Sequence, residues 1–348
     1  MYVSEPAGSP GRKLTDGSVD AQPAPSPDLS HVAFVRKADA SDYGGELWVL
    51  DLSPQLDPLG PPRRLVDPAT LPRVGGGVPP MVASPRWSPT AGQVAFVANP
   101  TGGMVDGGYL LVAAADTGGL VPTQQNVFAD PAFAWSPDGS HIAWLNHRSD
   151  VRPTNVNTLA AAEGDSTPVV TDTNASSVTY ARDGQAILFT NGEAPPDYVS
   201  RPFAVKTGGI YSVATPGGAV ANPPSRPAPL FTRQGSYYGN LAVLDSGAMA
   251  FAVSHIDNPS VTIQVLDAGS TVPRTTVTDV VTKPICHTTP SGGGVCYGVT
   301  PPAWGAGDFL AYLDNSPGRS LVVTDPDNRN PRRVDTGVDS FAWTPPSR

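Results

Sequence analysis

The sequence predicts an all-β fold, a six-bladed β-propeller, and three observations support it. A short phrase recurs through the whole chain, about every 53 residues between Pro27 and Pro345. Most copies are followed by further short apolar runs that suit strands. Turn formers are frequent, with 40 Pro and 36 Gly in 348 residues, so long helices are not expected. Four antiparallel strands repeated along a chain are typical of propeller blades.

The repeated phrase is clearest at residues 134–144, which read Ala-Trp-Ser-Pro-Asp-Gly-Ser-His-Ile-Ala-Trp. Pro presets φ, Asp bonds back to its own backbone, and Gly accepts a positive φ, so Ser-Pro-Asp-Gly predicts a tight turn. The aromatic residue before the turn and the apolar triplet after it predict two paired strands. Related copies lie at 26–34, 86–96, 180–189, 244–251, 303–312 and 341–345.

A third strand is expected after most copies, and a fourth, outer strand after some. The third strands are predicted at 46–51, 109–112, 209–213, 262–267 and 321–325, and outer strands at 63–66 and 332–334. Residues 158–163 suit either a third strand of blade three or a turn of helix. A β-sandwich of unrelated hairpins is the alternative, but sandwich strands share no recurring phrase.

Seven copies enclose six intervals, which predicts six blades. The last copy is too short for a blade, so we expect the C-terminal strand to join blade one and close the ring. Blade one is expected to need it because Pro25 stands where other copies carry Trp. Residues 1–20 are expected to be a lead-in, with 11–15 resembling an outer strand, and 21–348 a single propeller domain. An irregular seventh blade built from both termini is the runner-up.

The phrase Trp-Ser-Pro-Asp-Gly, with Leu47-Trp48-Val49-Leu50-Asp51 and Arg63-Arg64-Leu65-Val66 after an earlier copy, resembles the repeat of TolB-like propellers. It is also similar to the propellers of dipeptidyl-peptidase and prolyl-oligopeptidase proteins and of LpqB-type lipoproteins. The resemblance covers about residues 12–348. It implies a cell-envelope or extracellular propeller that binds other macromolecules, and it carries over no catalytic motif.

Charge and hydropathy exclude some classes of function. The net charge is −9, and no basic stripe with interleaved aromatic residues exists, so nucleic acid is not an expected partner. No apolar run reaches the 18 or so residues of a membrane span, so no transmembrane segment is expected. Residues 1–6 contain no signal-peptide core. We therefore expect either a cytoplasmic protein or a chain that begins after an exported leader.

The two cysteines favour export. Cys286 and Cys296 flank a Pro-Ser-Gly-Gly-Gly segment that a disulfide could close, and such pairs suit an oxidising compartment. Two free thiols, or a metal site with His287, are the alternatives. The favoured location is periplasmic, extracellular or attached to the envelope.

No catalytic motif is found in the sequence. A Gly-x-Ser-x-Gly elbow, a His-Glu-x-x-His helix and a P-loop are all missing. No catalytic residue, metal ligand or cofactor is therefore assigned. The alternative is a propeller enzyme of lactonase, lyase or glycosidase type, with a metal or a His/Asp site assembled from separate blades at the channel mouth.

Binding is expected on the face that carries the long loops, because loops on a rigid scaffold carry function more often than the scaffold does. Aromatic and arginine side chains usually dominate interface energies. The candidates are His147, Arg148, Asp150, Asp197, Tyr198, Arg201, Tyr237, Tyr238, His255 and Asp257. The favoured function is a non-catalytic, monomeric propeller that binds a protein or a cell-envelope polymer. A sensor domain of a larger envelope protein is a third possibility.

Overall fold

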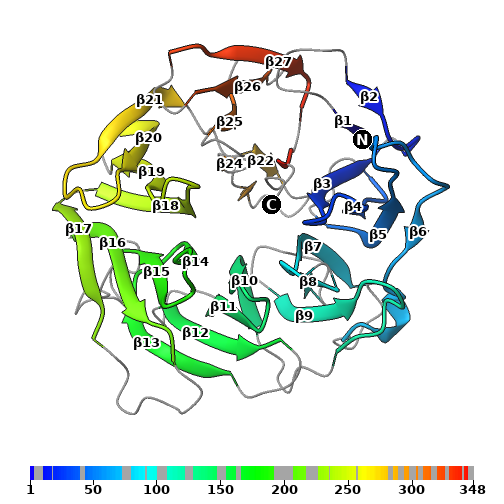
Figure 1. Ribbon diagram of the computed structural model, residues 1–348, viewed down its shortest axis with the longest axis horizontal. Coiled ribbons are helices and arrows are strands. Elements are labelled where there is room, and N and C mark those ends of the chain that lie inside the picture. The colour runs from blue at the N-terminus through cyan, green and yellow to red at the C-terminus, as the bar shows by residue number, and fades with distance from the viewer. Residues whose placement is uncertain are drawn as a thin grey trace.

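The chain forms an all-β, six-bladed propeller, as predicted (Figure 1). The computed structural model describes residues 1–3, 11–17, 19–39, 44–72, 80–90, 92–99, 108–121, 128–146, 154–161, 166–191, 207–216, 226–234, 236–255, 258–280, 285–288, 294–297, 303–304, 309–314, 320–325, 329–338 and 341–343. No helix long and apolar enough to span a membrane occurs in these ranges.

Each blade is an antiparallel sheet whose first strand is innermost (Figure 1). Blade one comprises β3 (Asp20–Pro25), β4 (His31–Arg36), β5 (Glu46–Asp51) and β6 (Arg63–Arg64); blade two, β7 (Met81–Trp87), β8 (Gln93–Asn99) and β9 (Gly108–Ala114); blade three, β10 (Phe128–Trp135), β11 (His141–Asn146), β12 (Thr154–Ala160) and β13 (Thr167–Thr173). The start of β10 also pairs with β9, which joins blades two and three into one sheet.

The second half of the ring repeats this order. Blade four comprises β14 (Val178–Tyr180), β15 (Ala186–Thr190), β16 (Thr207–Ala214) and β17 (Ala228–Gln234); blade five, β18 (Ser236–Val243), β19 (Met249–His255), β20 (Asn258–Leu266) and β21 (Arg274–Val280); blade six, β24 (Ala303–Trp304), β25 (Leu310–Leu313), β26 (Ser320–Thr324) and β27 (Arg332–Thr336). All five predicted third strands are present. Residues 158–160 belong to strand β12 rather than to a helical turn.

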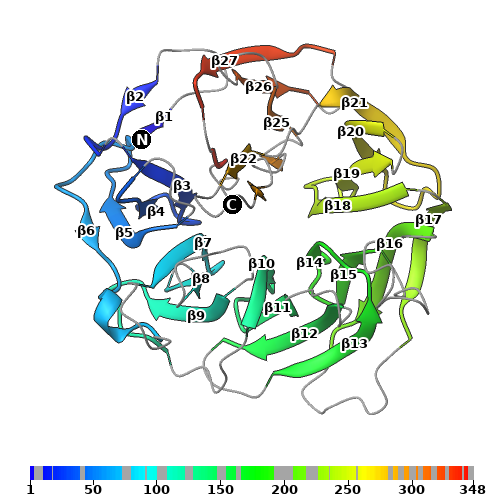
Figure 2. The same cartoon turned by 180° about the vertical axis from the view of Figure 1, so that it is seen from behind.

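Two hairpins lie outside the blades. β1 (Tyr2–Val3) pairs with β2 (Arg12–Lys13), and Leu14 beyond it packs on the apolar face of blade one. β22 (Ile285–Thr288) pairs with β23 (Gly294–Tyr297) between blades five and six, and β22 lies toward the middle of the ring in both views (Figures 1 and 2).

Blade one supplies its own inner strand, which corrects the expectation of a strand donated by the C-terminus. β3 pairs with β4 from Asp20 to Pro25. An inner strand is a sheet edge, and proline is tolerated on sheet edges because its missing N–H would face away from the neighbouring strand. Residues 341–343 are in no strand, and residues 339–340 and 344–348 lie outside the described part of the chain.

The core is a series of layers between neighbouring blades rather than one centre. One layer joins blades one and two through Val49, Val94 and Phe96, and another joins blades two and three through Val97 and Phe133. Similar layers follow between blades three and four and between four and five. Blades two, three and four therefore each bury apolar side chains against both of their neighbours, which makes this part of the scaffold rigid.

The Ser-Pro-Asp-Gly turns have the predicted chemistry. In blade three the buried Ser136 hydroxyl donates to Asp138 Oδ1 (2.5 Å) and accepts the amide of His141 (2.9 Å). Ser26 makes the same two bonds, to Asp28 (2.6 Å) and from the amide of His31 (3.0 Å). These short turns hold the inner and second strands at one end of the ring, which we call the turn end.

Candidate functional site

Most of the predicted binding residues lie outside the part of the chain that the structure describes. His147, Arg148, Asp150, Asp197, Tyr198, Arg201 and Asp257 are outside the described residues. Tyr237 lies in β18 and His255 in β19, but their side chains are also outside the described part. The long-loop face therefore remains a prediction.

Tyr238 is a core residue, which corrects its assignment as a surface contact. Its side chain is fully buried, and its ring meets the rings of Phe231 and Phe251 edge-on, at 5.7 and 5.5 Å. The Asn191 side chain pairs with both backbone groups of Tyr238, donating to its carbonyl (2.8 Å) and accepting its amide (3.1 Å). In the sequence, Gly235 and Gly239 flank Tyr237 and Tyr238 and predict a connection between blades, but Tyr238 lies in β18, the inner strand of blade five.

The two cysteines lie directly opposite each other across the β22–β23 ladder. Directly opposed residues of antiparallel strands have Cα atoms about 4.5–5.5 Å apart, which falls in the range that a disulfide spans. Their side chains are outside the described part, so the disulfide remains a prediction that the backbone register allows.

Tryptophan side chains connect the inner strands of neighbouring blades by hydrogen bonds. Trp87 Nε1 donates to the carbonyl of Ala24 in blade one (2.7 Å), and Trp135 Nε1 donates to the carbonyl of Arg86 in blade two (3.1 Å). Ala24 and Arg86 occupy equivalent positions of the repeat, each two residues before the serine of the turn. The phrase therefore encodes a contact from each of these blades to the blade before it.

Arg86 lies at the inner end of the contact between blades two and three, near the turn end of the ring. β7 has a bulge between Ala83 and Arg86, and Ser84 within it has a φ of 56°. A bulge redirects the side chains that follow it. Here the Arg86 guanidinium lies 4.8 Å from the centre of the Phe133 ring and donates to the carbonyl of Phe133.

The Arg86 side chain is exposed, yet its pKa is lowered to about 10. The cause is desolvation by the protein that surrounds the guanidinium. Both properties fit a residue on the inner wall of a ring, which water reaches while protein lies on every side. No carboxylate within the described residues forms an ion pair with Arg86. A charge in such surroundings without a counter-charge is a candidate functional site.

The aromatic side chains of Phe133 and Trp135 lie next to this arginine. The Trp135 indole is half-buried beside it, and Phe133 pairs across the sheet with Trp144. Trp144 Nε1 is buried, and the described part of the chain offers it no acceptor. A guanidinium with five donors, of which one binds Phe133, thus lies in a mostly aromatic setting. It can accept a carboxylate, phosphate or sulfate group.

Sequence reasoning missed Arg86, although a signal exists. Blades one and three carry Ala24 and Ala134 at this position of the phrase, and blade two carries arginine. Arg86 therefore puts a charged side chain next to Trp87, at a position where the other two blades have a small side chain. Such a residue departs from the structural repeat. Elsewhere in the described ranges, no three His, Cys, Asp or Glu side chains are grouped so that they could hold a metal ion.

Comparison by sequence matched no protein-family model and no curated protein. By structure, the chain is similar to TolB from Acinetobacter baumannii, with a TM-score of 0.53, 14% identity, and coverage of 88% of this chain and 64% of TolB. It is also similar to an oligogalacturonate lyase in complex with manganese (TM-score 0.58, 16% identity, 90% and 76% covered). A third similar structure is prolyl oligopeptidase B from Galerina marginata (0.59, 10%, 90% and 43%).

These similarities show the propeller fold alone, because all are below 25% identity. The chain spans less than two thirds of the length of that TolB and less than half of the oligopeptidase. The expected likeness to TolB and to peptidase propellers is thus confirmed at the level of fold. Because TolB, a lyase and an oligopeptidase share this fold, function has to be argued from the site.

Proposed function

We propose that this chain is a binding propeller whose partner presents an anionic group to Arg86 at the centre of the ring. The partner is a protein or a cell-envelope polymer, and the chain performs no chemistry on it. The observation that carries the proposal is an exposed arginine on an inner strand whose pKa is lowered by the surrounding protein. An anionic group bound there would compensate a charge that its surroundings penalise.

The geometry favours a planar anion such as a carboxylate. Guanidinium binds carboxylates through two parallel hydrogen bonds, and Phe133 limits the directions from which a ligand approaches. The half-buried Trp135 adds apolar surface next to the charge. Arginine and tryptophan together are the residue types that most often dominate binding energy.

The net charge of the protein narrows the kind of partner. At −9 the whole molecule repels polyanions at long range, so a densely charged polymer would associate slowly. A partner with one isolated carboxylate, such as the C-terminus of a protein or a sparsely charged glycan, meets little of this repulsion. We therefore favour an isolated carboxylate over a polyanion.

Paired probes that differ only in charge test this function. A random hexapeptide library with free C-termini and the same library with amidated C-termini are passed over the immobilised protein. Galacturonate, which carries a single carboxylate, and its methyl ester form a second pair. The proposal expects the charged member of at least one pair to be retained more strongly. Equal retention within both pairs would overturn it.

We also propose export to the periplasm, cell envelope or cell surface, on the basis of the cysteine pair and its register. Fractionation of the native host with an antibody against this chain tests the location. A purely cytoplasmic signal would contradict the proposal.

A further inference from the structure

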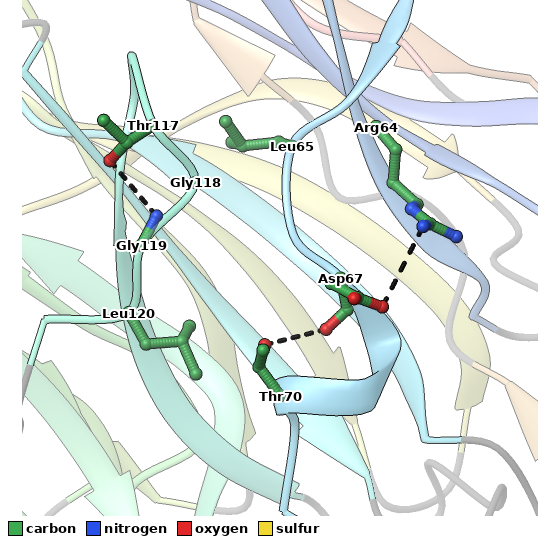
Figure 3. A pocket seen from close by; sticks show the side chains of 8 residues that line it. All are labelled: Arg64, Leu65, Asp67, Thr70, Thr117, Gly118, Gly119 and Leu120. Carbon is green, nitrogen blue, oxygen red and sulfur yellow. Dashed lines mark hydrogen bonds and ion pairs between the residues drawn. The ribbon is translucent and has the colours of Figure 1, made fainter.

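A cavity lies between the outer strand of blade one and the turn that follows β9 in blade two (Figure 3). Its volume is about 570 Å³, within the usual range for small-ligand sites. One wall follows β6 and the 3₁₀ turn Pro68–Thr70 of blade one, and the other is the turn after β9 in blade two. It is lined by Arg64, Leu65, Asp67, Thr70, Thr117 and Leu120, with Gly118 and Gly119.

The two walls are held together by backbone contacts. Gly118 has a φ of 69°, and a Cβ there would lie 1.6 Å from the carbonyl oxygen of Leu65, so only glycine allows this approach. Arg63 Nη2 donates to the carbonyl of Ala115 across the same junction (2.9 Å). The cavity is therefore formed before any ligand arrives, which lowers the cost of binding.

The walls offer donors and acceptors with the charges balanced. Arg64 lies 3.4 Å from Glu46 and 3.9 Å from Asp67, and Arg64 and Asp67 are 46% and 57% exposed. Such long, exposed ion pairs contribute little and exchange readily with other hydrogen-bonding groups. Figure 3 shows Arg64, Asp67 and Thr70 on one side and Thr117 and Leu120 on the other, with Leu65 between Thr117 and Arg64.

We infer that this cavity binds a neutral oligosaccharide segment. An anion would meet the Asp67 carboxylate, and a cation would meet the Arg64 guanidinium, so neither class gains from the site as a whole. Sugar hydroxyls both donate and accept, so they satisfy both groups together with Thr70 and Thr117. The apolar face of a sugar ring would rest on Leu120, which is partly exposed, because Leu65 is buried in the core between the two blades. The source is either a free oligosaccharide or an exposed glycan of a larger polymer.

Isothermal titration calorimetry with defined trisaccharides tests the inference. Maltotriose, cellotriose and chitotriose serve as neutral probes, and trigalacturonate as the anionic one. Binding of at least one neutral probe is expected, weakened at least tenfold by Arg64→Ala and by Asp67→Ala. Arg333→Ala is the matched control, because Arg333 lies on the outer strand of blade six with Asp314 as its carboxylate partner (3.2 Å). The Arg333→Ala variant is expected to bind the neutral trisaccharide with the affinity of the wild type.

Three of the results that would overturn the inference concern the neutral probes and the variants. They are no binding of any neutral probe, binding that survives both the Arg64 and the Asp67 substitution, and equal weakening by Arg333→Ala. Tighter binding of trigalacturonate that depends on Arg64 would also overturn the inference, since the site would then prefer an anionic ligand. If a neutral trisaccharide binds, additional retention of an insoluble glucan or chitin would show that the glycan of a polymer is also accepted. Because Arg86 is not part of this cavity, Arg86→Gln should leave this binding unchanged.

Discussion

Trp87 and Trp135 show how single residues connect one blade to the next. The Trp87 indole stacks on His31 of blade one, with ring centres 5.6 Å apart, while its Nε1 donates to the carbonyl of Ala24. Trp135 makes the same type of bond but is less buried than Trp87. Two copies of one motif therefore carry unequal shares of stability.

The first prediction compares these two tryptophans. Trp87→Phe leaves a buried carbonyl without its donor, which should lower the free energy of unfolding by about 1–3 kcal/mol. Trp135→Phe exposes its carbonyl to water and should cost less. Urea denaturation of both variants measures the difference. Equal losses would show that the indole bonds do not distinguish the two contacts.

Asp138 makes stability depend on pH. Bonds from Ser136 and then from Ser140 lower its pKa to about 2. Its unfolded value is about 3.9. Because the folded pKa is the lower one, the carboxylate stabilises the fold above the unfolded pKa, and this stabilisation is lost as the pH falls toward 2.

The second prediction concerns that pH dependence. The melting temperature of the wild type should fall more steeply between about pH 5 and pH 2 than that of Asp138→Asn. The effect should be small, because Asp138 is exposed and solvent screens it. Melting curves followed by circular dichroism at fixed ionic strength give the two slopes. Parallel slopes would contradict the stabilising role of this carboxylate.

At the scale of the element, the turns differ in how well their residues suit the backbone. Gly139, Gly184 and Gly247 have φ values of 73°, 72° and 81° in their turns, and blade one carries Leu29 at the same place with a φ of 60°. A side chain in this left-handed region is strained, by about 1–2 kcal/mol. Blade one therefore has a strained turn where blades three, four and five use glycine.

The third prediction tests the turns by exchange. Leu29→Gly should raise the unfolding free energy by about 0.5–1 kcal/mol, since relief of strain exceeds the added entropy of glycine in the unfolded chain. Gly139→Ala should lower it by more than Gly247→Ala, because its Cβ would lie 2.8 Å from Ser88 Oγ, whereas that of Gly247 would make an ordinary 3.9 Å contact. Thermal denaturation gives the order. Destabilisation by Leu29→Gly would refute the account of strain.

The fourth prediction concerns the β22–β23 hairpin. Protein produced in an oxidising compartment should resist thiol alkylation at Cys286 and Cys296 until a reductant is added, as the opposed register allows. The disulfide should stabilise the hairpin locally, by about 2–3 kcal/mol at most. Mass spectrometry before and after reduction counts the labels. Two labels without reduction would exclude the bridge.

At the scale of the whole molecule, the repeated phrase was enough to predict the ring and its blades. Turn chemistry is local, so Ser-Pro-Asp-Gly could be read without knowledge of the partner strands. Closure of the ring could not be predicted from local sequence, because whether Pro25 lies on a sheet edge depends on which strand is innermost. Tyr238 was misassigned for a similar reason: glycines flank a buried strand as readily as a loop.

The candidate site was less predictable than the fold. A ring brings together residues from separate blades, and Arg86 gains its aromatic surroundings from Phe133, in the next repeat. The cavity between blades one and two likewise joins Asp67 to Thr117 across a blade boundary. Neither arrangement leaves a spacing pattern in the sequence. Arg86 could still have been found as the charged residue at a small-residue position of the phrase.

The central claim is that Arg86 anchors an anionic partner at the centre of the ring. The most direct measurement is the dissociation constant of the best retained anionic probe for wild type, Arg86→Gln and Arg182→Gln. Arg182 is the matched control because it is also exposed and also donates to a backbone carbonyl of the next blade, that of Asp245. The account predicts at least a tenfold loss for Arg86→Gln and none for Arg182→Gln. Unchanged affinity in Arg86→Gln, or equal loss in both variants, would contradict it.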